Sequence, residues 1–134
     1  MRVLGIDFGR TRIGLAVMDT EYGIPTARNP IIASGTLRTD ADALDTFAKR
    51  EEAARIVLGL PLENGEEGKS ARIIRMLGEL LEQKGWPVSY VDETLTSHEA
   101  ETAMSSLGFK ASEQRARVDG EAACLILERF QEAE

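Results

Sequence analysis

The chain has 134 residues, of which 43% are hydrophobic and 29% charged, and its formal net charge is −7. This length suits one domain with a buried core, and the acidic balance argues against nucleic-acid binding by overall charge, although an acidic protein can hold a local basic groove. No apolar run reaches membrane-spanning length, no signal peptide is recognisable, and the single cysteine, Cys124, allows no internal disulfide. We therefore expect one cytoplasmic domain over residues 1–134, with no membrane partner.

Strand signals dominate the start of the chain. Val3 to Met18 holds two apolar runs joined by a short turn of glycine and arginine, which predicts two strands with a tight connection. Asn29–Leu37 predicts a third strand, which would complete an antiparallel meander. Thr39 is placed to cap a helix that reaches about Ala53.

Strands and helices alternate along the rest of the chain. Arg55–Gly59 is typical of a buried strand, and a loop at Glu63–Gly68 follows it. The clearest helix runs from Ser70 to about Lys84, with an apolar side at helical spacing that comprises Ile73, Leu77, Leu80 and Leu81. The later elements are predicted as a strand at Pro87–Val91, a helix from Thr96 to about Leu107, a loop over Lys110–Arg117 and a helix from about Val118 to Gln131. The predicted order is βββαβαβαα.

This order brings distant carboxylates to one edge of the predicted sheet. Asp7 ends the first strand and the Asp92-Glu93 pair follows the fifth, so both lie at the carboxyl ends of strands, where ligands bind in such sheets. Asp119 shares a helix face with Ala122, Ala123 and Ile126. The small alanines in the first turn of that face would let the helix lie close to the sheet. Carboxylates that converge need a cation, and oxygen ligands suit Mg²⁺ or Mn²⁺.

Each acid also has a simpler interpretation. Asp7 could simply accept hydrogen bonds from the amides of Phe8 and Gly9 in a turn, with no role in a site. Asp119 could be the N-cap of the last helix, a role worth about 1 kcal/mol. Asp92 could lie outside the ring of direct metal ligands and act on the site through another residue, because neighbouring residues on an extended chain point to opposite sides.

Five short motifs, in order and nearly along the whole chain, resemble the YqgF/RuvX family. They are Gly5-Ile-Asp-Phe-Gly9, Arg12-Ile-Gly-Leu-Ala16, Val57-Leu-Gly-Leu-Pro-Leu62, Asp92-Glu93 with Leu95-Thr96, and Val118-Asp119 with Ala122-Ala123 and Ile126-Leu127. These bacterial proteins have a ribonuclease H-like fold and are described as pre-16S rRNA nucleases and as Holliday junction resolvase homologues. The chain departs from the pattern at Thr94, where the family usually has arginine, and in a shorter loop at Glu63–Glu67.

The resemblance implies a fold, a metal site and a reaction. The fold would be an α/β, ribonuclease H-like mixed five-stranded sheet flanked by helices. Asp7, Glu93 and Asp119 would be the catalytic acids that hold two Mg²⁺ or Mn²⁺ ions, and a two-metal mechanism would hydrolyse phosphodiester bonds. The expected reaction is 5′-end processing of pre-16S rRNA, and the alternative is resolution of four-way DNA junctions, by a monomer or a homodimer. Four basic residues are candidates for phosphate contacts: Arg10, Arg12, Lys69 and Arg72.

Two other classes of function compete with the nuclease. The turn Asp7-Phe-Gly-Arg-Thr11 is similar to the phosphate-binding loop of the sugar kinase and actin superfamily, which would make the chain an ATP-binding protein. Those proteins close two such domains around the nucleotide, whereas 134 residues suit one. The other competitor is a nucleic-acid-binding module of the same fold without catalytic activity.

Overall fold

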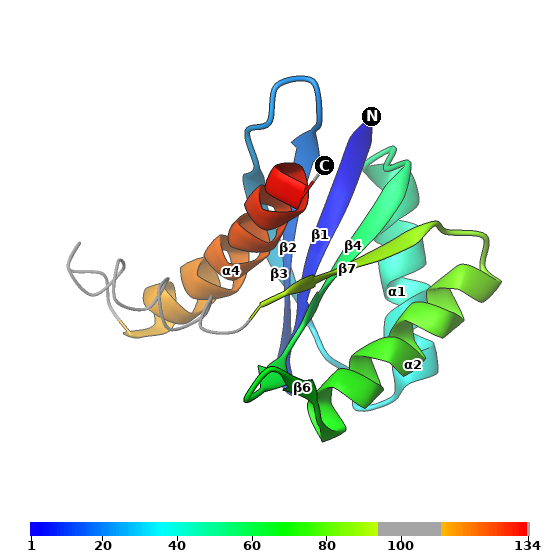
Figure 1. The fold of residues 1–134 in the computed structure, drawn as a ribbon. Helices are drawn as coiled ribbons and strands as arrows, with labels where there is room; N and C mark the ends of the chain where they lie inside the picture. Colours follow the sequence, from blue (N-terminus) through cyan, green and yellow to red (C-terminus); the bar gives the residue numbers. More distant parts are fainter. Residues whose placement is uncertain (94–110, 134) are drawn as a thin grey trace.

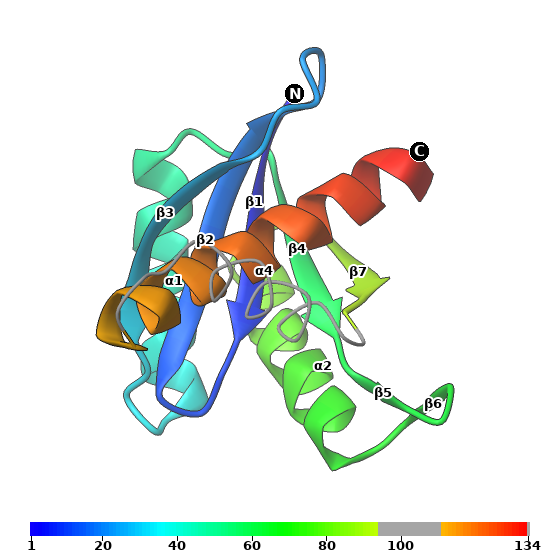
Figure 2. The ribbon, with the colours of Figure 1, turned by 90° about the vertical axis from the view of Figure 1, so that its left-hand side faces the viewer.

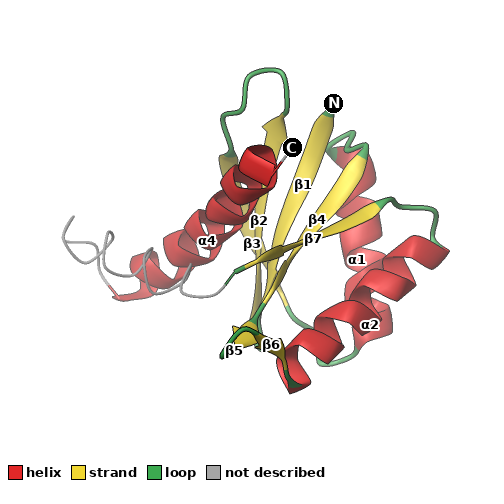
Figure 3. Ribbon diagram, viewed as in Figure 1, coloured by secondary structure: helices red, strands yellow, loops and turns green. Residues whose placement is uncertain are grey.

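A five-stranded mixed sheet is the centre of the molecule (Figures 1 and 3). The computed structural model describes residues 1–93 and 111–133, with side chains described over 1–93 and 120–133. The strand order is β3-β2-β1-β4-β7, in which β1 to β3 form the predicted antiparallel meander and β4 and β7 run parallel to β1. The strands are β1 (Arg2–Phe8), β2 (Arg12–Asp19), β3 (Thr26–Ile32), β4 (Arg55–Leu60) and β7 (Val88–Asp92). The mixed five-stranded sheet expected from the sequence is confirmed.

Several element boundaries differ from those predicted. The third strand ends at Ile32 instead of Leu37, because Gly35 turns the chain with a φ of +89°. The helix that follows is α1 (Leu37–Arg50), whose N-cap is Thr36 and not Thr39. The predicted loop at Glu63–Gly68 contains a small hairpin of β5 (Leu62–Glu63) and β6 (Glu66–Glu67), which leads into α2 (Lys69–Gln83).

The last helix, α4 (Ala111–Ala133), begins seven residues before the predicted start at Val118. Residues 111–117 were predicted as a loop, but they contain no glycine or proline and are mostly good helix formers. Asp119 therefore lies inside the helix, so its interpretation as an N-cap is wrong. The predicted helix from Thr96 to Leu107 and the departure at Thr94 lie outside the described residues. Over the described ranges, no helix has both the length and the apolar character needed to cross a membrane.

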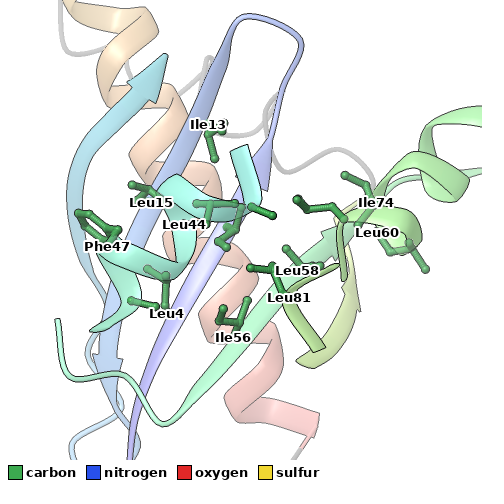
Figure 4. Packing of buried hydrophobic residues seen from close by; sticks show 14 of the residues in the cluster. Leu4, Ile13, Leu15, Leu44, Phe47, Ile56, Leu58, Leu60, Ile74 and Leu81 are labelled. Carbon is green, nitrogen blue, oxygen red and sulfur yellow. The ribbon is translucent and has the colours of Figure 1, made fainter. Parts of the chain in front are cut away.

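The two faces of the sheet are covered differently. In Figure 2, α4 crosses in front of the sheet, and α1 and α2 lie behind it. The face under α1 and α2 holds the larger core, which is built mainly from branched aliphatic side chains (Figure 4). The fully buried members of that core include Leu4, Ile6, Ile13, Leu15, Leu44, Ile56, Leu58, Leu77 and Leu81.

The face under α4 holds a smaller core with small residues at its centre. Val3, Ala16 and Val57 of the sheet pack against a stripe of α4 that consists of Ala123, Cys124, Ile126, Leu127 and Phe130. A Cβ atom placed on Gly5 would lie 2.6 Å from Leu127 Cγ and 3.0 Å from the Ala123 carbonyl oxygen. Because such contacts are too short for real atoms, glycine at this position is what allows the helix to lie so close to the sheet.

Candidate active site

Asp7 lies near the carboxyl end of β1, on the α4 face of the sheet. It pairs with Gly14 of β2 and is half-buried. Side chains alternate along a strand, so Asp7 shares the face of Gly5, whereas Ile6 enters the core under α1 and α2. In the turn that follows, the Gly9 amide donates to the Arg12 carbonyl oxygen at 3.0 Å. The Gly9 amide is thus occupied by the backbone, which contradicts its predicted role as a partner of Asp7.

Glu93 follows β7 and brings a second carboxyl group to the same place. Its backbone amide donates to the Leu60 carbonyl oxygen at 3.2 Å, which anchors the residue beyond the end of β4. A Cβ atom on Gly59 would lie 2.6 Å from Glu93 Oε2 and 2.5 Å from Ile126 Cδ1. Gly59 therefore leaves the space that the Glu93 side chain occupies between β4 and α4. The neighbouring Asp92 is exposed, so Glu93 is the member of the acidic pair that enters the fold.

The carboxyl groups of Asp7 and Glu93 lie within hydrogen-bonding distance of each other. Burial raises the pKa of Glu93 to about 9, and the hydrogen bond with Asp7 and the charges of Asp7 and Asp92 act in the same direction. The two groups can be accommodated if one of them carries a proton or if a cation lies between them. Oxygen donors in a partly buried pair fit a hard divalent cation such as Mg²⁺ or Mn²⁺.

α4 crosses the strands of the sheet diagonally (Figure 2). Gly120 lies against Ala27 of β3, Ala123 and Leu127 lie against Gly5, and Ile126 lies against Gly59. Position 119 is one helical turn before Ala123, so its backbone belongs to the segment of α4 that crosses the sheet. The Asp119 side chain lies outside the described part of the chain, within which no three acidic, histidine or cysteine side chains form a metal-binding group. The structure thus brings Asp7 and Glu93 together, and Asp119 as a third ligand stays a prediction.

The predicted phosphate-binding residues lie on two neighbouring segments. Arg10 is exposed and Arg12 half-buried in and after the β1–β2 turn, and Lys69 and Arg72 are exposed in the first turns of α2. Arg10 and Ile73 line the same cavity, which has a volume of about 250 Å³. The β1–β2 turn and the start of α2 are therefore adjacent, as a shared phosphate-binding surface would require.

Sequence reasoning missed one basic residue at the site. Arg129 of α4 donates from Nη1 to the Asp92 carbonyl oxygen at 2.6 Å, and its positive charge acts to lower the pKa of Glu93. It also ties the far part of α4 to the end of β7. The available signal was an arginine three residues after the buried Ile126, inside an otherwise acidic tail. Arg129 thus places a positively charged side chain beside the carboxyl groups of Asp7 and Glu93.

Comparison with known proteins identifies the family. The family model described as "RuvX: Holliday junction resolvase" matches residues 1–133. A protein of Anaeromyxobacter dehalogenans (strain 2CP-1) named "Putative pre-16S rRNA nuclease" is 45% identical over 133 residues, which cover 96% of this chain and 94% of that protein.

Solved structures support the fold. Thermus thermophilus RuvC in complex with a Holliday junction substrate superposes with a TM-score of 0.60 at 16% identity, over 99% of this chain and 94% of RuvC. The Fowlpox virus Holliday junction resolvase gives a TM-score of 0.58 at 12% identity over the full length of both chains. These likenesses confirm the predicted ribonuclease H-like fold. The full-length family match and the close relative together show that the chain belongs to the RuvX (YqgF) family.

Proposed function

We propose that this protein is a divalent-metal-dependent endonuclease that hydrolyses phosphodiester bonds in structured nucleic acid, and that its reaction is 5′-end processing of pre-16S rRNA. The observation that carries the proposal is the contact between the Asp7 and Glu93 carboxyl groups at the carboxyl edge of the sheet. A carboxyl group whose pKa is raised by burial and by a second acid is costly for the fold and is typical of functional sites. Family membership supports the same class of reaction.

Asp7, Glu93 and Asp119 would hold two Mg²⁺ or Mn²⁺ ions. When bound, the ions supply an activated water and stabilise the charge that develops on the leaving 3′-oxygen. The protein's part is to hold the acids in place. Glu93 is fixed by its backbone hydrogen bond to Leu60 and by the space above Gly59. The raised pKa of Glu93 favours the protonated carboxyl group in the metal-free protein, whereas a bound cation would favour the charged form.

Substrate binding would use the basic residues around the same edge. Arg10, Arg12, Lys69 and Arg72 are candidates for contacts with phosphate groups, which position a nucleic acid without reading its sequence. Arg10 and the first turns of α2 border one cavity, which supports a continuous binding surface. Such contacts make binding depend on salt, because each one releases counterions from the nucleic acid.

The name of the relative from Anaeromyxobacter supports pre-rRNA as the substrate. The second candidate is the Holliday junction. The description of the family model favours it, and Thermus thermophilus RuvC, which has the same fold, was solved in complex with a Holliday junction substrate. Symmetric cutting of a junction requires two active sites related by a two-fold axis, whereas trimming of a precursor requires one.

A direct test is a cleavage assay with Mn²⁺, side by side, on RNA that carries the 5′ precursor end and on a four-way DNA junction. We expect cleavage of the RNA by the parent protein and by Asp92→Asn, and none by Glu93→Gln. Faster cutting of the junction would favour the resolvase instead. Binding without cleavage of either substrate would identify a non-catalytic module. Melting temperatures with EDTA and with Mn²⁺ give a readout independent of activity, and we expect Mn²⁺ to raise the melting temperature of the parent but not of Glu93→Gln.

A further inference from the structure

A cavity of about 250 Å³ lies at the same edge of the sheet as the candidate active site, but on the other face. Its walls come from the end of β1, the β1–β2 turn, the segment between β3 and α1, and the first turns of α2. Phe8 lines the cavity and packs against the core under α1 and α2. Asp7, its neighbour on β1, points to the α4 face, because side chains alternate along a strand. A nucleic acid that crosses this edge could therefore reach both places.

The wall of the cavity is mostly apolar. Phe8, Ala33 and Leu37 are half-buried lining residues, and Ile73, another lining residue, is 44% exposed. The prediction that Ile73 belongs to the apolar core side of α2 is therefore wrong. The residues that α2 buries are instead Ala71, Ile74, Leu77, Gly78 and Leu81. An aromatic ring and aliphatic side chains around an open cavity are suited to a flat, apolar ligand.

Asp40 of α1 is the unusual residue of this wall. It is 3% exposed, less than any other charged side chain that the structure describes. Its Oδ1 accepts a hydrogen bond from the Ser34 amide at 2.9 Å. Within the described part of the chain, Oδ2 has no hydrogen-bond partner and the carboxylate forms no ion pair. Burial of a carboxylate with so few partners costs free energy, so a ligand that donates hydrogen bonds in the cavity would be stabilised.

This combination of groups is suited to an unpaired nucleobase. A carboxylate only accepts hydrogen bonds, so the ligand must present N–H groups. Unpaired bases carry such groups on the edge of a flat ring that stacks on aromatic side chains. The volume is below the roughly 300–1,000 Å³ of pockets for drug-sized ligands, as a single base requires. Guanine matches best, because its N1–H and N2–H₂ groups lie side by side and can donate to both oxygens of one carboxylate.

Arg10 adds a positive charge at the same cavity. It is exposed, lines the cavity, and forms no ion pair with any residue that the structure describes. Contacts with phosphate position a nucleic acid, whereas contacts with base edges read its sequence. The Asp40 carboxylate would repel a phosphate group and Arg10 would attract one. The two residues thus provide different places for the base and for the backbone of one nucleotide.

We propose that this cavity binds an unpaired guanine of the nucleic-acid substrate, with the base against Phe8, its N–H groups donating to Asp40 and its phosphate at Arg10. The proposal rests on the proposed function, because it requires a nucleic acid at this edge of the sheet. It adds recognition of a base to that function, which the metal-binding acids do not provide. The nucleotide that is read would lie near the bond that is cut, on the opposite face of the same strand end.

The test is the binding of RNA hairpins with one unpaired nucleotide, measured by fluorescence anisotropy in EDTA so that no cleavage occurs. The unpaired nucleotide is guanosine, inosine, uridine or an abasic site, and a parallel series uses DNA hairpins. We expect the parent to bind the guanosine hairpin about tenfold more tightly than the abasic one, as one bidentate base contact predicts. Inosine, which lacks the N2 amino group, should lie between them. The DNA series shows whether the cavity reads guanine in both nucleic acids.

Asp40→Asn separates recognition of the base from support of the fold. The amide oxygen of asparagine can still accept the hydrogen bond from the Ser34 amide, but its NH₂ group replaces Oδ2 and cannot accept one from guanine. We expect the variant to lose the preference for guanine while its melting temperature and its affinity for the abasic hairpin stay near those of the parent. Asp42→Asn is the matched control, because it removes the same charge from a side chain of α1 that is 69% exposed.

Equal affinity of the parent for all hairpins would overturn the proposal, and so would a preference for guanine that persists in Asp40→Asn. If the hairpins show no preference but 5′-GMP raises the melting temperature of the parent, the cavity binds a free nucleotide instead. Cleavage assays with Mn²⁺ distinguish this proposal from the proposed function. A preference for guanine without cleavage would contradict the nuclease alone, whereas cleavage of RNA without any preference in binding would contradict the guanine site alone.

Discussion

The two faces of the sheet differ in how closely their helices pack and in what that packing achieves. Under α1 and α2, bulky aliphatic residues such as Leu44, Ile56 and Leu58 fill the space between the layers and provide most of the buried apolar volume. Under α4, Gly5, Gly59 and Ala123 keep the space small, so that the helix lies close to the strands. The first face contributes stability through hydrophobic burial, and the second uses close approach to hold Asp7 and Glu93 together. Substitutions on the two faces should therefore have separable effects on stability and on cleavage.

The largest effect should come from the acid on the α4 face. Glu93→Gln keeps the shape of the side chain but removes the charge that a divalent ion needs. We expect cleavage to fall about a thousandfold, since metal stabilisation of the transition state contributes several kcal/mol. Rates at saturating Mn²⁺ measure this effect, with Asp92→Asn as the exposed neighbour that should stay near the parent. A Glu93→Gln protein that cuts at the parent rate would show that the pair of Asp7 and Glu93 is not catalytic.

A cavity on the opposite face should lower stability without affecting the chemistry. Leu44 is completely buried in α1, so Leu44→Ala should reduce the free energy of unfolding by about 3 kcal/mol. Urea unfolding at constant pH gives that value. Cleavage per folded molecule, measured below the melting transition, should stay within about twofold of the parent, a change worth less than about 0.5 kcal/mol. A tenfold loss of cleavage would mean that the two faces are coupled.

Two glycine substitutions compare the faces directly. In Gly59→Ala the new methyl group would collide with Glu93 and Ile126, and in Gly78→Ala it would collide with the Tyr90 hydroxyl group. Both should cost about 1 to 3 kcal/mol of stability, because overpacking displaces neighbouring side chains. Only Gly59→Ala should also reduce cleavage, because it moves Glu93. Equal loss of cleavage in both variants would contradict this distinction.

The last comparison concerns the pH dependence of the metal-free protein. The pKa of Glu93 is raised from 4.5 to about 9 in the folded state, so the folded chain binds a proton that the unfolded chain releases between these values. The corresponding stability is fully present below pH 4.5 and is lost as the pH rises toward 9. The melting temperature of the parent in EDTA should therefore fall relative to that of Glu93→Gln over this range. Parallel curves would show that Glu93 is ionised throughout.

The sheet could be predicted from the sequence because its signals are local. Apolar runs bounded by glycine, proline and polar residues mark β1, β2 and β4, and the switch to helical spacing marks the parallel crossovers. The phase of α2 could not be predicted in the same way. A spacing that includes Ile73 and one that includes Ile74 both look apolar, and the burial of Ala71 and Gly78 decides between them. Small residues carry little hydrophobic signal even when they are at the centre of a contact.

The site was predictable to a similar extent. The topology places Asp7 and the Asp92-Glu93 pair at one edge, as the strand order implied. The sequence alone does not distinguish Asp92 from Glu93, because that choice depends on the space above Gly59. The contribution of Arg129 depends on the angle at which α4 crosses the sheet, which no local pattern encodes. The role of Asp119 as a third metal ligand stays a prediction.

The position of Cys124 allows the separation of α4 from the sheet to be measured by thiol labelling. Its thiol is the single one in the chain and is buried between α4 and the sheet, and burial raises its pKa to about 12. A thiol reagent can therefore react only during moments when the helix separates from the strands, since the reactive thiolate is otherwise almost absent. The rate of labelling of the unmodified protein would measure how often the layer above the acidic pair opens. It would do so without any engineered cysteine.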